Sequence, residues 1–299
     1  MSTRGRFEGV FTALVTPFSG DVVDRDALLA LVEWQIASGV SGLVPCGTTG
    51  EAPTLTAAEQ AKVVRWVVDA AAGRVPVIAG IGSNSTAKAI ENARRVEDAG
   101  AAAVLATAPY YNKPTQAGLV AHFTAVADAV SATTDVVLYD VPGRTAVRLD
   151  RSTILTLAGH PRVAALKDAT GDLIHASHLA AEVPEGFSLL SGDDGTTMPF
   201  VCVGGHGCIS VLSNVLPAET AAMVEAARDG DLDTARELHQ RLTPLMTDLF
   251  IQTNPLPVKA ALAELGRIEE RYRLPLVPMD AGPRARLVQT LRSVAPAAG

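Results

Sequence analysis

Cysteine is scarce in this chain, with three copies among 299 residues, at positions 46, 202 and 208. Their number is odd, their spacing is wide, and no C-x-x-C pair or neighbouring histidine pattern accompanies them. These features argue against a disulfide framework and against a zinc site, because both need matched sets of side chains. We therefore expect Cys46, Cys202 and Cys208 to be buried free thiols.

Runs of lysine and arginine are also missing, and 32 acidic against 25 basic residues give a formal net charge of −7. This balance argues against nucleic acid and against an anionic membrane as partners, since both need a basic patch. A small anionic substrate remains compatible, provided that local positive groups bind it.

Long apolar runs are absent, and none approaches the ~18 residues that a membrane helix needs. The first apolar run, residues 9–17, is short, ends at Pro17 and lacks the small-residue pattern of a cleavage site. We expect a first strand there rather than a signal peptide, and a cytoplasmic protein with no membrane partner.

The main signal is a repeated alternation of short β-like runs with longer amphipathic segments. Eight such units over roughly 230 residues favour a closed (β/α)8 TIM barrel, and an open doubly wound sheet is the alternative. The G-x-G-x-x-G signature that would favour a dinucleotide fold follows none of the runs, although this absence counts only modestly. The expected strands are residues 10–15, 42–46, 75–79, 102–107, 136–139, 163–167, 187–190 and 207–211.

The alternation stops near Gly230, and the remaining chain has helical patterns only. These patterns cover residues 233–250, 257–265 and 283–294 and are separated by proline-rich segments. We therefore expect an α/β chain in two parts: a catalytic barrel at residues 1–230 and a C-terminal helical extension at residues 231–299.

Lys167 closes the short apolar run 163–167, which is bounded by Pro161 and Gly171 and is expected to be a buried strand. Lysines are rarely buried without a partner, and desolvation lowers the pKa of the amine towards a nucleophilic form. The alternative is a surface lysine that buries only its stem. Because barrel active sites form at the carboxyl ends of the strands, Lys167 is the first candidate for the chemistry.

Hydroxyl, phenol and guanidinium groups follow other expected strands. Thr48 and Thr49 lie in the loop 47–51, which suits a carboxylate or phosphate but could also be an ordinary turn. Tyr139 can exchange protons and Arg144 can bind a carboxylate, although a tyrosine can also plug a barrel mouth and an arginine can point into solvent. Together with Lys167, these groups suit imine chemistry on a keto acid.

Other polar residues give weaker signals. Asp193 and Asp194 are more readily explained as residues that open a helix than as a metal pair. His175 and His178 lack a third ligand, and a solvated helix face is the simpler interpretation. Glu51 could be a base or could brace its own loop. These residues therefore give no convincing metal or nucleotide site.

Six motifs resemble the dihydrodipicolinate synthase family, class I pyruvate-dependent aldolases. They occur in the family's order and span nearly the whole chain: GTTGE at 47–51, YYNKPT at 110–115, YDVPGRT at 139–145, LKDATG at 166–171, SGDD at 191–194 and NPLPVK at 254–259. The resemblance implies a barrel with a C-terminal helical extension, no cofactor, and a homotetramer built as a dimer of dimers.

The resemblance also implies catalytic roles. Lys167 would form a Schiff base with pyruvate, and Tyr139 would be the acid/base. Thr48 would link Tyr139 to Tyr111 of a neighbouring subunit in a proton relay. The expected product is 4-hydroxy-tetrahydrodipicolinate, an intermediate of lysine and diaminopimelate biosynthesis.

Four further positions would bind the substrates. Thr49 would hold the pyruvate carboxylate, the backbone of Ile209 would face bound pyruvate, and Gly192 would also lie at the substrate. Arg144 would receive the carboxylate of L-aspartate 4-semialdehyde.

Two other functions remain open: another pyruvate-dependent aldolase, such as one resembling N-acetylneuraminate lyase or a keto-acid or sugar-acid aldolase, and a catalytically silent paralogue that only binds a keto acid. Arg144 and the Thr48–Thr49 pair favour the synthase branch. The intact set of Lys167, Tyr139, Thr48 and Arg144 argues against a silent paralogue.

The chain departs from the family pattern at two places. Asp140 stands where asparagine is commoner, a change expected to alter a local bond rather than the reaction. Several positions that bind lysine in feedback-inhibited members are changed, although Asn84 and Tyr110 match, so we predict weak or absent inhibition by lysine. The changed residues are Ala52, Pro53, Ala57, Gln60 and Lys88.

Overall fold

The computed structural model describes residues 7–294. Within this range, no helix is both long enough and apolar enough to cross a membrane. The two-part division at Gly230 includes residues 1–6 and 295–299, which lie outside the described residues.

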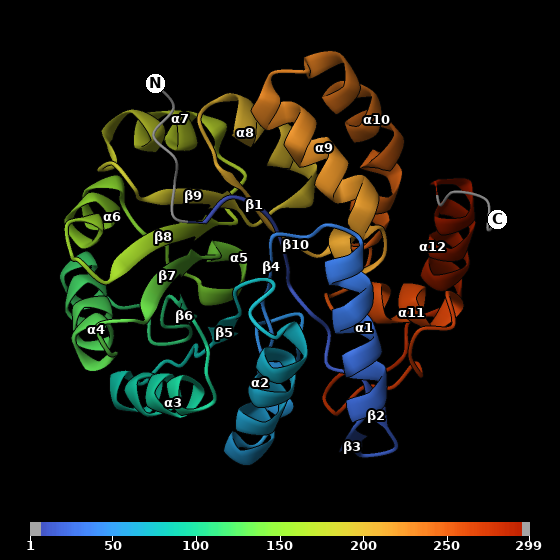
Figure 1. Cartoon of the computed structure of the whole chain (residues 1–299), viewed down its shortest axis with the longest axis horizontal. Coiled ribbons are helices and arrows are strands. Elements are labelled where there is room, and N and C mark those ends of the chain that lie inside the picture. Colours follow the sequence, from blue (N-terminus) through green and yellow to red (C-terminus); the bar gives the residue numbers. More distant parts are fainter. Residues whose placement is uncertain (1–6, 295–299) are drawn as a thin grey trace.

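Eight parallel strands form the centre of the molecule (Figure 1). Neighbours along the sheet follow the order β4-β1-β10-β9-β8-β7-β6-β5. A parallel bridge from Leu43 to Val77, just before β5, joins the two ends of this order and closes the barrel. The expected (β/α)8 fold is therefore confirmed. Its strands are Gly9–Thr12 (β1), Gly42–Leu43 (β4), Ile78–Gly80 (β5), Ala103–Thr107 (β6), Asp135–Asp140 (β7), Val163–Asp168 (β8), Ser188–Ser191 (β9) and Gly207–Ser210 (β10).

Helices surround the strands, and side-chain caps stabilise the starts of some of them. Thr56 forms a reciprocal capping box with Glu59, and the side chains of Asp24 and Thr115 accept backbone N–H groups at two other starts. The helices of the barrel are Arg25–Ala37 (α1), Ala57–Ala71 (α2), Thr86–Asp98 (α3), Gln116–Ala129 (α4), Pro142–Thr145 (α5), Arg151–Ala158 (α6), Leu173–Glu182 (α7), Thr197–Cys202 (α8) and Pro217–Asp229 (α9).

Three short 3-10 turns lie in the loops, at Ala52–Thr54 (η1), Asp194–Thr196 (η2) and Leu212–Asn214 (η3). A two-stranded hairpin, Phe18–Ser19 (β2) with Val22–Val23 (β3), leaves the barrel after β1. The sequence did not predict this hairpin. It also overestimated β4, which spans two residues rather than five because the chain turns away through Pro45 and Cys46, the latter with φ +56°.

Alternation along the strands divides the apolar side chains into two cores. The inner core fills the barrel and includes Val137, Tyr139, Ala165 and Ile209. The outer core lies between strands and helices and includes side chains such as Leu138. The residue after each inner-facing position therefore faces the helices. Along each strand this alternation places the catalytic candidates inside the barrel and the residues that follow them outside it.

The C-terminal segment consists of Leu232–Asp248 (α10), Leu256–Glu264 (α11) and Ala281–Val294 (α12). Figure 1 shows α10 beside α9, with α11 and α12 gathered on the same side of the barrel. Buried residues of all three helices, such as Leu242, Leu262 and Leu287, belong to the outer core. The C-terminal helices therefore share a core with the barrel, and the division at residue 230 stays an interpretation of chain organisation.

Candidate active site

Lys167 and Tyr139 lie side by side near the ends of β8 and β7. The two residues are paired in the strand register, and the Lys167 Nζ lies 4.3 Å from the centroid of the Tyr139 ring. Lys167 is 6% exposed and Tyr139 is 5% exposed. No carboxylate of residues 7–294 pairs with Lys167, so the structure has a buried amine against a phenol, not a solvated lysine with a buried stem.

Gly192 leaves the space that Lys167 occupies. A Cβ atom at Gly192 would lie 3.0 Å from the Lys167 Cε and 2.9 Å from the Ala169 Cβ. The Gly192 N–H also donates to the carbonyl of Asp168, next to Lys167. A side chain at Gly192 would therefore push against the lysine stem.

The loop 47–51 follows β4 and turns back on itself through backbone hydrogen bonds. The Glu51 N–H donates to the Thr48 carbonyl, and the Ala52 N–H donates to the Gly47 carbonyl. Thr48 is half-buried, whereas Thr49 is buried and its hydroxyl accepts a hydrogen bond of 2.9 Å from the Asn254 side chain. The two threonines thus have different surroundings within one loop.

Arg144 and Thr49 are joined through one residue of the C-terminal segment. Arg144 lies on the short helix α5, and its guanidinium donates to the Asn254 carbonyl at 3.1 Å. Asn254 is buried and its Oδ1 atom has no hydrogen-bond partner among the described residues. The sequence motif at 254–259 contained Asn254, but nothing in its composition indicated this bridging position.

A cavity of about 340 Å³ opens between these loops. It is lined by residues from several separate parts of the chain, among them Thr48, Leu105, Arg144 and Asn254. Lys167 and Tyr139 are not lining residues of this cavity, and their low exposure agrees with that position. Leu105 and Val141 line the cavity and also belong to the inner core that contains Tyr139.

Tyr110 and Tyr111 differ although they are adjacent. Tyr110 lines the cavity. Tyr111 is 88% exposed, adopts φ +68° and is not a lining residue. Within one chain the Tyr111 phenol is therefore left at the surface. Its expected action in a neighbouring subunit stays a prediction.

Ile209 lies on β10, paired with Phe11 of β1, and its buried side chain is part of the inner core. The position of its backbone at the barrel's interior is compatible with the expected pyruvate contact. That contact itself stays a prediction.

Asp194, one of the acidic candidates, makes hydrogen bonds that hold the fold together. Asp194 is buried and accepts the N–H groups of Val211 and Leu212 at 3.0 and 2.8 Å, which ties the end of β9 to the end of β10. Burial raises the pKa of the Asp194 carboxyl, and hydrogen bonds from Ser210 and from these two amides partly oppose the change. Among the described residues, no group of three His, Cys, Asp or Glu side chains could hold a metal ion.

All three cysteines are free, and Cys46 and Cys208 are buried as expected. Burial raises the pKa of the Cys46 thiol to about 12, so this thiol is not a nucleophile near neutral pH. The expectation for Cys202 was wrong, because this residue is exposed at the end of the short helix α8.

Asp140 and Asp168 follow Tyr139 and Lys167 and are paired in the same register. Both are buried, and one carboxyl oxygen of each has no hydrogen-bond partner within residues 7–294. Burial raises the pKa of Asp140 to about 7; the Leu149 N–H opposes this and the Asp168 charge adds to it. By the parity of the strands these acids face the helices, away from the amine and the phenol.

Comparisons with known proteins agree with this geometry. The model of the dihydrodipicolinate synthetase family matches residues 6–294. A relative from Maridesulfovibrio salexigens, named 4-hydroxy-tetrahydrodipicolinate synthase, is 49% identical over 288 residues, which are 96% of this chain and 98% of the relative.

Two solved structures superpose on nearly the whole chain. One is the chloride-inhibited dihydrodipicolinate synthase from Acinetobacter baumannii in complex with pyruvate, with 40% identity, a TM-score of 0.93, and coverage of 96% of this chain and 98% of that one. The other is the enzyme from Cyanidioschyzon merolae with lysine bound, with 38% identity, a TM-score of 0.94, and coverage of 97% and 99%. A family model over residues 6–294 and a relative at 49% identity over 96% of the chain establish that this chain belongs to the dihydrodipicolinate synthetase family.

Proposed function

We propose that this chain is a lyase that condenses pyruvate with L-aspartate 4-semialdehyde to 4-hydroxy-tetrahydrodipicolinate, in lysine and diaminopimelate biosynthesis. The observation that carries the proposal is the buried Lys167 amine, 4.3 Å from the centre of the Tyr139 ring and without an ion-pair partner in the described chain. Full-length relatives that carry the synthase name support the same reaction. We further propose a cytoplasmic location, as the family's metabolic role implies.

Imine formation is the first step. The neutral Lys167 Nζ adds to the C2 carbonyl carbon of pyruvate, and the carbonyl oxygen leaves as water after protonation. Tyr139 lies against the amine and supplies and removes the protons. The Thr49 hydroxyl, fixed by Asn254, is our candidate for holding the pyruvate carboxylate.

Carbon–carbon bond formation follows from the charge on the imine nitrogen. This charge withdraws electrons from C3, which loses a proton and becomes an enamine nucleophile. C3 then bonds to the aldehyde carbon of the semialdehyde, whose oxygen becomes the hydroxyl of the product. Finally the semialdehyde's amino group attacks C2 and displaces the Lys167 amine, which closes the ring and releases the enzyme.

Arg144 is our candidate for orienting the semialdehyde. Arg144 lines the cavity, and the Asn254 carbonyl accepts from one of its guanidinium N–H groups while other donors remain for a carboxylate. A polyol substrate would have less use for a cation at this place, and this favours the synthase over a sugar-acid aldolase.

We propose a homotetramer, a dimer of dimers, in which Thr48 links Tyr139 to Tyr111 of the neighbouring subunit. The 88% exposure of Tyr111 in one chain supports an action outside that chain. Measurement of mass in solution tests the assembly, and a monomer with full activity would contradict the relay through a second subunit.

Borohydride reduction in the presence of pyruvate tests the imine. We expect one added pyruvate unit per chain, on the peptide that contains Lys167, and no adduct in Lys167→Ala. Lys62→Ala, at an exposed position on α2, is the matched control and should be labelled as strongly as the unmodified chain. A labelled Lys167→Ala chain would contradict the assignment.

The second substrate needs a separate assay. Product formation from pyruvate and L-aspartate 4-semialdehyde is compared with cleavage of N-acetylneuraminate at equal enzyme concentration. We expect turnover only in the first assay. An imine with pyruvate but no turnover of the semialdehyde would leave a different aldolase or a silent binder as the function.

A further inference from the structure

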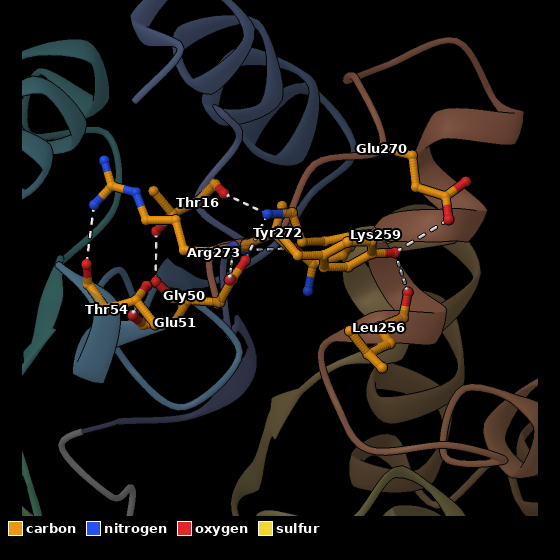
Figure 2. Close-up of polar contacts among 11 residues, drawn as sticks. Thr16, Gly50, Glu51, Thr54, Leu256, Lys259, Glu270, Tyr272 and Arg273 are labelled. Atoms are coloured by element: carbon orange, nitrogen blue, oxygen red, sulfur yellow. Dashed lines mark hydrogen bonds and ion pairs between the residues drawn. The ribbon is translucent and has the colours of Figure 1, made fainter. Parts of the chain in front are cut away.

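A second buried lysine lies beside the catalytic loop and takes no part in the proposed chemistry. The Lys259 Nζ on α11 lies 2.5 Å from the Glu51 Oε1 in loop 47–51, and both side chains are 0% exposed. Figure 2 shows the pair with its surroundings. Two opposite charges removed from water need further polar partners, because their mutual attraction alone rarely offsets desolvation.

Those partners come from the start and the end of the chain. Lys259 also donates to the Thr16 carbonyl at 3.0 Å, and its Nζ lies 4.3 Å from the Phe18 ring centroid and 5.3 Å from that of Tyr272. The other Glu51 carboxylate oxygen, Oε2, accepts the backbone N–H of Arg273 at 3.4 Å (Figure 2). The ammonium is thus held by one carboxylate, one carbonyl and two aromatic faces.

The pair fixes the end of the loop that carries Thr48 and Thr49. Glu51 adopts φ +53°, a left-handed conformation that a glutamate occupies only when its surroundings compensate for the strain. One residue earlier, the Gly50 carbonyl accepts the Thr16 hydroxyl at 2.7 Å. Contacts with Thr16, which follows β1, and with Lys259 of α11 therefore set the conformation of Gly50 and Glu51, the last two residues of the loop.

The same short segment of the C-terminal region also holds the middle of the loop. Asn254, five residues before Lys259, donates to the Thr49 hydroxyl, while its carbonyl accepts Arg144. Side chains 254 and 259 thus hold the loop at two points, Thr49 and Glu51. A pair that served stability alone could be replaced by apolar side chains of similar volume, often without loss.

We propose that Lys259 is a positioning residue of the reaction: through its ion pair with Glu51 it holds loop 47–51 in the geometry that binds the pyruvate carboxylate and relays protons from Tyr139. The proposal rests on the function proposed above. It gives α11, one of the C-terminal helices, a role in positioning the active-site loop. It requires that loosening the pair affects pyruvate more than it affects folding.

Three variants test the pair. Lys259→Met removes the charge and keeps an unbranched chain, Glu51→Ala removes the carboxylate, and Glu51→Gln keeps an oxygen that can accept from Lys259. Because misplacement by about 1 Å can reduce a rate about 100-fold, we expect kcat/KM for pyruvate to fall roughly 10- to 100-fold in the first two. Glu51→Gln should recover most of that loss and remain about 3-fold below the unmodified enzyme.

The readouts are the rate of borohydride-trapped imine, kcat, the KM of each substrate and the thermal midpoint. We expect a slower imine step and a raised KM for pyruvate, with a smaller change in the KM for the semialdehyde. Leu262→Ala, on the same helix and fully buried, is the matched control. It should lower the thermal midpoint and leave the KM for pyruvate within about 2-fold, because truncating an apolar side chain removes no charge and no hydrogen bond.

The outcomes are distinct. If folded Lys259→Met and Glu51→Ala keep kcat/KM within about 3-fold of the unmodified enzyme, the positioning role is refuted while the synthase function stands. If Lys259→Met yields no folded protein, the contrast between Glu51→Ala and Glu51→Gln decides, and equal losses in both contradict the proposal. An unmodified enzyme that traps no pyruvate would refute the synthase function instead.

Discussion

Replacing Asp140 by asparagine should make the protein more stable, and increasingly so as the pH rises from 4 to 8. The Asp140 carboxyl is buried on the helix-facing side of β7, and its pKa is raised from 3.8 to about 7. Between these two values the folded state keeps a proton that the unfolded state releases. Unfolding is therefore favoured progressively as the pH increases through this window.

The magnitude follows from the size of the shift. A difference of about 3 pKa units at about 1.36 kcal/mol each corresponds to about 4 kcal/mol, reached above pH 7 and absent below pH 4. Asparagine does not titrate, so Asp140→Asn lacks this loss. Its side-chain carbonyl can still accept the Leu149 N–H.

The assay is denaturant unfolding of the unmodified chain and Asp140→Asn at pH 5, 6, 7 and 8, with the difference in unfolding free energy plotted against pH. We expect this difference to increase by about 3 kcal/mol over that range, with kcat within about 3-fold because Asp140 faces away from Tyr139. Asp231→Asn is a control without a slope in this range: hydrogen bonds from Thr234 lower the pKa of this exposed cap, so it is ionised in both the folded and the unfolded chain from pH 5 to 8 and its removal should cost the same stability at each pH. A difference that stays flat with pH would refute the reasoning.

Four further predictions concern the active site. Arg144→Ala should raise the KM for the semialdehyde about 10-fold or more and leave pyruvate trapping intact, since a lost charged hydrogen bond costs about 1.5–3 kcal/mol; loss of trapping alone would contradict this role. Gly192→Ala should slow imine formation, because a Cβ would lie 3.0 Å from the Lys167 Cε, and an unchanged trapping rate would show that the strand yields instead. Co-expression of the inactive Tyr111→Phe and Lys167→Ala chains should restore part of the activity if Tyr111 acts across subunits, because a mixed assembly can combine Lys167 of one chain with Tyr111 of the other. No activity in the mixed assembly would count against that. Lysine at sub-millimolar concentration should leave the rate nearly unchanged, and a several-fold decrease in a steady-state assay would overturn the prediction made from the changed lysine-binding positions.

The barrel could be predicted from the sequence because each strand is a short apolar run next to an amphipathic segment. The ends of elements were less accurate: residues 44–46 are apolar and favour a strand, yet Cys46 takes a left-handed conformation just before loop 47–51. The local amino-acid composition favours a strand, whereas the turn depends on contacts with residues further along the chain. The hairpin β2–β3 was missed for a similar reason, because each of its strands has only two residues.

The sequence indicated candidate residues where one residue type suits the chemistry, as with Lys167, Tyr139 and Arg144, and their roles stay predictions. Asn254 and Lys259 gave no such signal, since neither follows a barrel strand and an asparagine before a proline usually indicates a turn. Their importance arises from contacts with Thr49 and Glu51, more than 200 residues away along the chain. Long-range pairs of this kind cannot be inferred from spacing in a single sequence.

The two-residue period of the strands explains why the proposed chemistry and the titrating acids can be tested separately. Tyr139 and Lys167 point into the barrel, while Asp140 and Asp168, one position later, point towards the helices. Replacing Asp140 alters the outer layer, where the free energy of unfolding depends on a buried charge. Replacing Tyr139 alters the inner layer, where the proposed proton donor is lost. Because backbone hydrogen bonds between β7 and β8 hold both pairs in one register, a pH-dependent gain in stability without a change in imine formation is the result that the fold itself predicts for Asp140→Asn.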